Sequence, residues 1–178
     1  LRAGFPGVTF LPARSETSPD QSIALGELTR ALAGFAPEIC GLAEPDTCLY
    51  GPGLPEMIRR EAWDGLLYGG RTDIDTVIPG TAPLLPASGF MFFPGKLLPL
   101  IHTDEVSFSM PWWDLRTAFV LLTRKIPLKK VLSPPAFRPM RQVEPSADAW
   151  VHYGRVMTRL AHPDFSLNVE TVRQFHAI

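Results

Sequence analysis

The hydrophobic pattern of the first 125 residues alternates between short apolar runs and helical stripes. The runs are four residues long, as buried strands often are, and they occupy residues 8–11, 39–42, 66–69 and 90–93. Between them, apolar positions recur every three or four residues, which is typical of the buried face of an amphipathic helix. Strands that alternate with helices indicate an α/β or α+β fold with a mixed sheet. Of the two we expect α/β, with helices on both faces of the sheet.

Three helices are predicted in this part of the chain. The first begins near Ser18, whose side chain suits a helix cap, and continues to Phe35 before Pro37 ends it. The second covers residues 54–63. The third covers residues 113–125 and carries basic residues at its C-terminal end, which the helix dipole favours.

Composition is consistent with one globular domain. The chain has 178 residues, of which 46% are hydrophobic and 20% are charged. Within a single domain over residues 1–178, we expect a strand–helix core at 1–125 and a mostly helical part at 126–178. A formal net charge of -1 gives no support to nucleic-acid binding. Residues 76–95 carry no charge, but four prolines interrupt them, so we expect no membrane span and a cytoplasmic protein.

Charge is distributed unequally between the two halves of the chain. Residues 1–89 carry 6 basic and 11 acidic side chains, net -5, whereas residues 90–178 carry 11 and 7, net +4. An acidic half suits a divalent cation and a basic half suits a phosphate. Two complementary surfaces of one domain would explain the same difference.

Acidic side chains follow two of the predicted strands. Glu44 and Asp46 come after the second run, and Asp73 and Asp75 come after the third. Ligands of α/β sheets bind at the carboxyl ends of strands, where carboxylates can hold Mg²⁺ or Mn²⁺. Acidic residues in turns also cap helices and close Asx-turns, which is the competing interpretation.

The order of four segments resembles that of bacterial glycosyltransferase-like proteins with the GT-A fold, the nucleotide-diphospho-sugar transferase fold. The segments are Ile-Cys-Gly at 39–41, Gly-Arg-Thr-Asp-Ile-Asp at 70–75, Ser-Gly-Phe-Met-Phe-Phe-Pro at 88–94 and Pro-Trp-Trp-Asp at 111–114. The family's short Asn-x-Asp-Ile-like metal motif is replaced here by Ala-Glu-Pro-Asp-Thr at 43–47. The nucleobase-binding strand that usually opens the fold has no counterpart, so we expect a GT-A-like fold that is incomplete at its N-terminus.

The resemblance implies a transferase of polysaccharide biosynthesis, which moves a sugar from a nucleotide-diphosphate donor to a glycan or other hydroxyl acceptor. It implies a divalent cation, Mn²⁺ or Mg²⁺, held by Asp46 and Glu44. Four residues are implied to contact the substrate: Arg71, Asp73, Asp75 and Trp113. Asp114 is implied to be catalytic, as the base that accepts a proton from the acceptor hydroxyl.

Each of these roles has a structural alternative. Trp113 would then be a core residue, and Asp114 would be the cap of its helix. The whole chain could equally be a non-catalytic GT-A-like module that binds a protein or a carbohydrate. An enzyme should gather Asp46, Asp73 or Asp75, and Asp114 around one cleft, whereas a binding module would scatter them. We prefer the enzyme interpretation and carry the module as its alternative.

Overall fold

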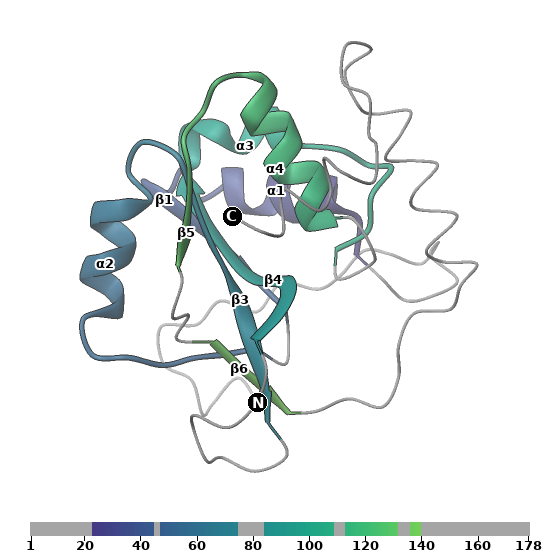
Figure 1. Ribbon diagram of the computed structural model, residues 1–178. Coiled ribbons are helices and arrows are strands. Elements are labelled where there is room, and N and C mark those ends of the chain that lie inside the picture. The colour runs from purple at the N-terminus through teal and green to yellow at the C-terminus, as the bar shows by residue number, and fades with distance from the viewer. Residues whose placement is uncertain (1–22, 45–46, 75–83, 109–112, 132–135, 140–178) are drawn as a thin grey trace, which may run out of the picture.

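The computed structural model describes residues 23–44, 47–74, 84–108, 113–131 and 136–139, shown in colour in Figure 1. The helices are α1 (Leu25–Ala33), α2 (Leu54–Glu61), α3 (Leu98–Ile101) and α4 (Trp113–Thr123), and a 3-10 turn, η2 (Gly95–Leu97), precedes α3. The strands are β1 (Ile39–Ala43), β2 (Cys48–Leu49), β3 (Leu66–Ile74), β4 (Leu84–Pro94), β5 (Leu128–Val131) and β6 (Ala136–Pro139).

These strands form one mixed sheet. Its order is β1-β4-β3-β6-β2, and β5 pairs with β3 as well. β4 is antiparallel to both β1 and β3, while β5 and β6 are parallel to β3. Four strands, β1, β3, β5 and β6, therefore run in one direction. The α/β class and the mixed sheet that the alternating pattern predicts are confirmed for the described part of the chain.

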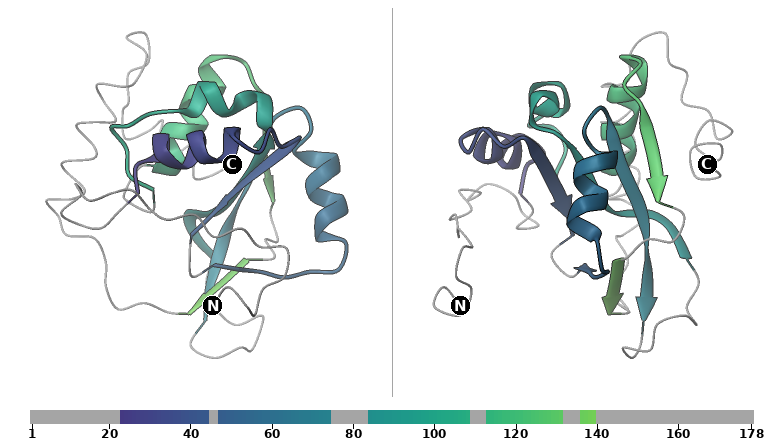
Figure 2. Two further views of the ribbon diagram at one scale, coloured as in Figure 1. Left: turned by 180° about the vertical axis from the view of Figure 1, so that it is seen from behind. Right: turned by 90° about the vertical axis from the view of Figure 1, so that its left-hand side faces the viewer.

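The hydrophobic core lies on one face of this sheet. Leu42 on β1, Met91 on β4 and Tyr68 on β3 are register partners and are all buried. Helices α1, α3 and α4 supply the other half of the core, including Leu25, Ile101 and Leu121. Figure 2 shows these three helices gathered in the upper part of the molecule, with α2 apart from them. Since α2 contains no buried residue, helices on both faces of the sheet stay a prediction.

The predicted elements of the core are present, with some differences in length. The first helix begins at Leu25 rather than near Ser18, because Ala24 is extended and forms a β-bridge with Ser107. Helices at 54–61 and 113–123 and the strand at 39–43 agree closely with the apolar pattern. β3 and β4 are longer than their apolar runs because they pair with each other, so that backbone hydrogen bonds extend the strands into polar sequence. None of the described helices is long and apolar enough to cross a membrane.

The expectation of a mostly helical part at 126–178 stays a prediction, because the structure describes only residues 126–131 and 136–139 of it. Those residues form β5 and β6, two strands of the main sheet. Prolines and basic residues hide them in the sequence, but both pair with the exposed edge of β3, which supplies the hydrogen bonds. The predicted strand at 8–11 and the remainder of 126–178 lie outside the described residues.

Candidate functional site

The carboxyl ends of β1 and β3 lie at the same end of the sheet. Both strands pair with β4, and Phe90 of β4 is the partner of Ala43 on one side and of Gly69 on the other. Glu44 directly follows β1, and its N–H donates to the carbonyl of Gly89, with a nitrogen–oxygen distance of 3.5 Å. The turn after β1 therefore lies level with the start of the Gly-Arg-Thr-Asp segment of β3.

The pairing of β3 with β4 is irregular at this level. Gly69 pairs with Phe90 and Gly70 pairs with Ser88, and the next pair joins Arg71 to Leu85, so the register shifts twice. Residues of β4 are left without a partner at each shift, as in a β-bulge. Bulges bend and twist a strand and are frequent next to active sites, where they redirect side chains. The irregularity therefore marks this end of the sheet as the candidate site.

The register also limits which groups can act together. Neighbouring strands are about 4.8 Å apart and successive residues about 3.3 Å apart, and β4 separates β1 from β3. By this spacing the backbones of Glu44 and Arg71 are about 10 Å apart, and those of Glu44 and Asp73 about 14 Å apart. We therefore treat Glu44 and Asp73 as belonging to separate parts of the candidate site.

Asp73 lies opposite a basic position that sequence reasoning did not assign to the site. In the parallel pairing of β3 with β6, Asp73 is the register partner of Arg138. Arg138 belongs to a short strand between prolines, so its alternating pattern was too brief to reveal a strand. The one available signal was the excess of basic residues in the second half of the chain. The sheet therefore adds Arg138 to the candidate residues.

The turn after β1 contains an oxygen atom without a hydrogen-bond partner. The Thr47 N–H donates to the Glu44 carbonyl over 2.9 Å and closes the turn. The Thr47 Oγ1 atom is buried, and it has no hydrogen-bond partner among the described residues. A buried hydroxyl without a partner costs about 1–3 kcal/mol, so such an atom calls for a ligand or a water. Hydroxyl and carboxylate oxygens suit Mg²⁺ and Mn²⁺, so this turn fits the implied cation.

The structure describes one of the two residues predicted to hold the metal. Within the described ranges, no group of three or more His, Cys, Asp or Glu side chains is arranged to hold a metal. Glu44 is half-buried and described, whereas Asp46 lies outside the described residues, as does Asp75. Glu44 and the hydroxyl of Thr47 are accordingly the described oxygen donors of this turn.

Trp113, one of the residues implied to contact the substrate, is buried. Its side chain is only 3% exposed, and its ring meets that of Phe108 edge-on, with the ring centroids 4.7 Å apart. Stacking on a sugar requires an open ring face, which this buried side chain does not offer. Trp113 is a core residue here, because the first turn of α4 packs against the core cluster.

Asp114 lies in the first turn of α4 and is buried. The Asp114 side chain is 8% exposed, and its Oδ1 accepts the Leu115 N–H over 2.8 Å. That N–H is one of the donors at a helix N-terminus without a partner in the helix. The geometry favours the helix-terminal interpretation of Asp114.

Arg116, two residues farther along α4, is a buried cation that the sequence analysis did not single out. Its guanidinium donates to the carbonyls of Ile101 and His102 at the end of α3, while its Nε has no partner among the described residues. Burial lowers the pKa of this arginine to about 10. Arg116 thus satisfies the last carbonyls of α3 and joins two helices of the core.

The candidate site consists of the turn at 44–47, the register-shifted segment of β3 from Gly70 to Asp73, and Arg138 on β6. The structure brings Glu44, Arg71 and Asp73 to one end of the sheet and leaves Trp113 in the core. Comparisons of the chain with protein-family models, with curated proteins and with solved structures give no match.

Proposed function

We propose that the chain is a glycosyltransferase of the GT-A type, which transfers a sugar from a nucleotide-diphosphate donor to a glycan or other hydroxyl acceptor. The observation that carries the proposal is the common direction of β1, β3 and β6. Their carboxyl ends bring acidic and basic positions to one end of an α/β sheet, which is where such sheets bind ligands.

The turn at 44–47 is proposed to hold a divalent cation. Glu44, Asp46 and the Thr47 hydroxyl would supply the oxygen ligands, and the buried Oγ1 without a partner supports this assignment. When bound, such a cation neutralises the charge that develops on the departing nucleotide diphosphate. The residues themselves hold the turn closed through the hydrogen bond from Thr47 to Glu44.

The segment from Arg71 to Asp73 is proposed to bind the donor. A guanidinium donates two parallel hydrogen bonds to phosphate oxygens, so Arg71 suits the diphosphate. Asp73, at about 14 Å from Glu44 by strand spacing, suits hydroxyls of the sugar or ribose rather than the cation. Arg138 occupies the register position opposite Asp73 and is proposed to belong to the same segment. Asp75 belongs to the same proposed donor-binding segment.

Nucleotide-sugar binding tests the proposal directly. The melting temperature is measured with UDP-, GDP- and dTDP-sugars, each with and without Mn²⁺, and we expect one donor to raise it only when Mn²⁺ is present. Thr47→Val should weaken this binding about tenfold while leaving the unliganded protein equally or more stable, because it removes a buried unsatisfied hydroxyl. Thr123→Val is the matched control, since Thr123 donates to Val120 in an exposed turn of α4.

Two results would contradict the proposal. If none of the nucleotide sugars changes the melting temperature under either condition, the donor site does not exist. If a donor binds but Thr47→Val and Thr123→Val bind it equally well, the turn at 44–47 is not the cation site.

Asp114 needs a separate test, because a general base takes up a proton whereas a helix-terminal carboxylate only accepts a hydrogen bond. Asn accepts the Leu115 N–H as well as Asp does, but it cannot take a proton. As a base, Asp114→Asn should lower turnover about 100-fold with donor binding unchanged. Normal turnover in this variant would assign Asp114 to the stability of α4 alone.

A non-catalytic binding module is the second candidate function, and the burial of Trp113 and Asp114 favours it. In that case the site would bind its ligand without consuming it. Release of nucleoside diphosphate is measured with a range of glycan acceptors. If the chain binds the donor but releases no nucleoside diphosphate with any of them, the binding module is supported over the enzyme.

A further inference from the structure

The opposite end of the sheet, where the parallel strands begin, is formed by four neighbouring loops. They are residues 34–38 before β1, 95–96 after β4, 62–65 before β3 and 124–127 before β5, in the order of the strands. Backbone hydrogen bonds join them in pairs: Gly95 donates to Glu38, and Leu66 donates to Pro127, both over 2.9 Å. These loops and the last turn of α4 are named the amino-end surface.

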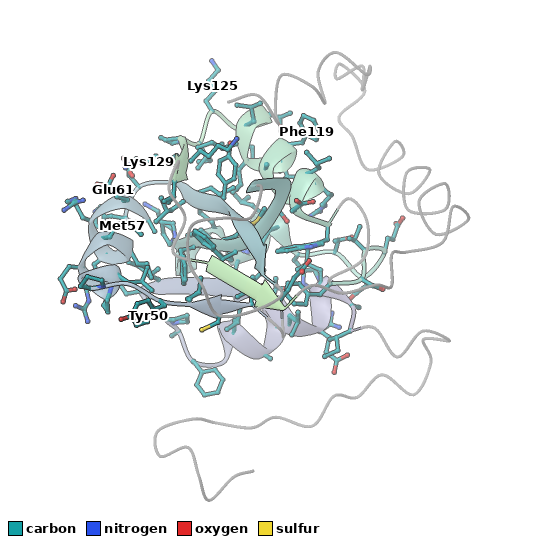
Figure 3. All side chains as sticks on the ribbon, turned by 60° about the horizontal axis from the view of Figure 1, so that its bottom comes forward. Tyr50, Met57, Glu61, Phe119, Lys125 and Lys129 are labelled. Carbon is teal, nitrogen blue, oxygen red and sulfur yellow. The ribbon has the colours of Figure 1, made fainter. Side chains whose placement is uncertain are left out.

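Large apolar side chains are concentrated on this surface. Four large hydrophobic residues of the described chain are exposed, and three of them belong to it: Phe35 at 58%, Trp63 at 59% and Leu122 at 46%. Each sits on a different loop or turn of this surface, so they are separate apolar tips. The fourth, Tyr50, lies far from Lys125 in Figure 3.

The same surface is basic. Lys96, Arg124 and Lys125 are exposed on its loops. Two nearby acidic side chains are paired: the Nζ of Lys129 lies 2.9 Å from a carboxylate oxygen of Asp64 and 3.6 Å from one of Glu61. Glu38, on the loop before β1, is also exposed, and the three basic side chains outnumber it. Figure 3 shows Lys129 beside Glu61, at the end of α2 that leads to Trp63.

The lowered pKa of Asp64 supports the proximity of the loop after β4 to the loop before β3. The hydrogen bond from Lys129 and, to a smaller extent, the charge of Lys96 lower the pKa of this carboxyl group. Lys96 follows β4 and Asp64 precedes β3, so the two loops are close enough for their charges to interact.

We propose that the amino-end surface docks on an anionic lipid membrane. Tryptophan and phenylalanine insert their rings at the headgroup level, and lysine and arginine beside them are attracted to anionic lipids. Separate aromatic tips flanked by basic residues match that chemistry. The cores of protein interfaces are instead depleted in lysine and form continuous patches. The proposal does not depend on the proposed function, whose residues lie at the other end of the sheet.

Vesicle sedimentation tests this proposal. The whole chain is mixed with vesicles of phosphatidylcholine alone or of phosphatidylcholine with phosphatidylserine, and the bound fraction is measured as lipid concentration rises. We expect binding to the phosphatidylserine vesicles, weaker binding at high salt and little binding to phosphatidylcholine alone. Removing one basic residue, as in Lys125→Gln, should weaken binding about fivefold, and Trp63→Ala should weaken it about tenfold.

Tyr50→Ala is the matched control, because it removes an aromatic side chain that is 73% exposed outside the amino-end surface. It should leave vesicle binding unchanged. All three substitutions are at exposed positions, and unchanged melting temperatures establish that each variant is folded.

Several outcomes would overturn the proposal. Absence of binding to phosphatidylserine vesicles excludes membrane docking. Equal losses in Trp63→Ala and Tyr50→Ala place the contact elsewhere. Binding to a soluble polyanion such as heparin without binding to vesicles would assign the surface to an acidic macromolecule instead.

Discussion

The two ends of the sheet differ in how tightly they are built. At the amino end the loops touch through backbone: a Cβ atom at Gly95 would overlap the carbonyl oxygen of Pro37, and one at Gly65 would overlap that of Pro127. At the carboxyl end the pairing of β3 with β4 shifts register twice, and the Thr47 hydroxyl is buried without a partner among the described residues. Backbone packing is thus tight at the amino end, whereas strand pairing is irregular at the carboxyl end.

This difference assigns separate roles to the two ends. Unsatisfied polar atoms and bulges cost stability, and native proteins retain them chiefly where a ligand will use them. Close backbone contacts hold the strands in register and leave side chains free to point outward. Stability should therefore depend on the amino end, and ligand binding on the carboxyl end.

The largest effect is expected from Gly95→Ala. The added Cβ would collide with the Pro37 carbonyl, and backbone cannot yield as a flexible side chain can, so we expect a loss of about 3 kcal/mol in the free energy of unfolding. Urea unfolding measures it. Gly53→Ala is the control: its Cβ would meet no atom, but its φ of 72° disfavours alanine and should cost about 1 kcal/mol. Equal losses in the two variants would contradict the role of close packing.

The second prediction concerns the carboxyl end and separates binding from stability. Glu44→Gln should change the free energy of unfolding by less than about 0.5 kcal/mol, because the side chain is only half-buried. It should nevertheless remove the effect of Mn²⁺ on nucleotide-sugar binding, measured by calorimetry. Glu56→Gln, on an exposed part of α2, is the matched acidic control and should bind as the unsubstituted chain does. A large stability loss in Glu44→Gln would mean that this end, too, is structural.

A smaller, stabilising effect is expected at the connection between α4 and β5. Lys125 has a positive φ of 58°, and the Lys125 and Ile126 N–H groups donate to Leu122 and Leu121 in the pattern of a Schellman turn. Glycine adopts this conformation without strain, so Lys125→Gly should raise the free energy of unfolding by about 0.5–1 kcal/mol.

Arg124→Gly provides the control for that change, because Arg124 does not have a positive φ. It should lower the free energy of unfolding, since glycine there only adds freedom to the unfolded chain. If both substitutions act in the same direction, the backbone conformation of Lys125 is not what limits stability.

The smallest effect is the titration of Asp64 at the amino end. Its pKa is lowered below the ordinary 3.8, first by the hydrogen bond from Lys129. A lowered carboxyl pKa stabilises the fold above the unfolded value, and that contribution is lost as pH falls through the folded value, here below pH 3.8. Nuclear magnetic resonance of the carboxyl carbon should show the pKa rising toward 3.8 in Lys129→Gln. Asp104, whose pKa is lowered by Arg30, should titrate unchanged in that variant.

Helices α2 and α4 and most of the core strands could be predicted from local pattern alone, whereas α3 was not predicted and α1 begins later than expected. Apolar residues spaced every three or four positions identify α2 and α4, and short apolar runs identify β1 and the first half of β3. A helix forms its hydrogen bonds within about four residues, so the information that specifies it lies in one segment. The acidic residues at the ends of two strands were visible for the same reason.

The remaining features depended on contacts between distant segments. β2, with two residues, and β6, with four, are too short to show a strand pattern in the sequence. They become strands because β3 extends far enough for β6 to pair with it, and β2 pairs with β6. Arg138 joins the candidate site only through that pairing. Trp113 is buried and Arg116 binds the end of α3 because α4 packs across the core. Sheet hydrogen bonds and side-chain burial join residues far apart in the chain, so these outcomes were decided by tertiary structure.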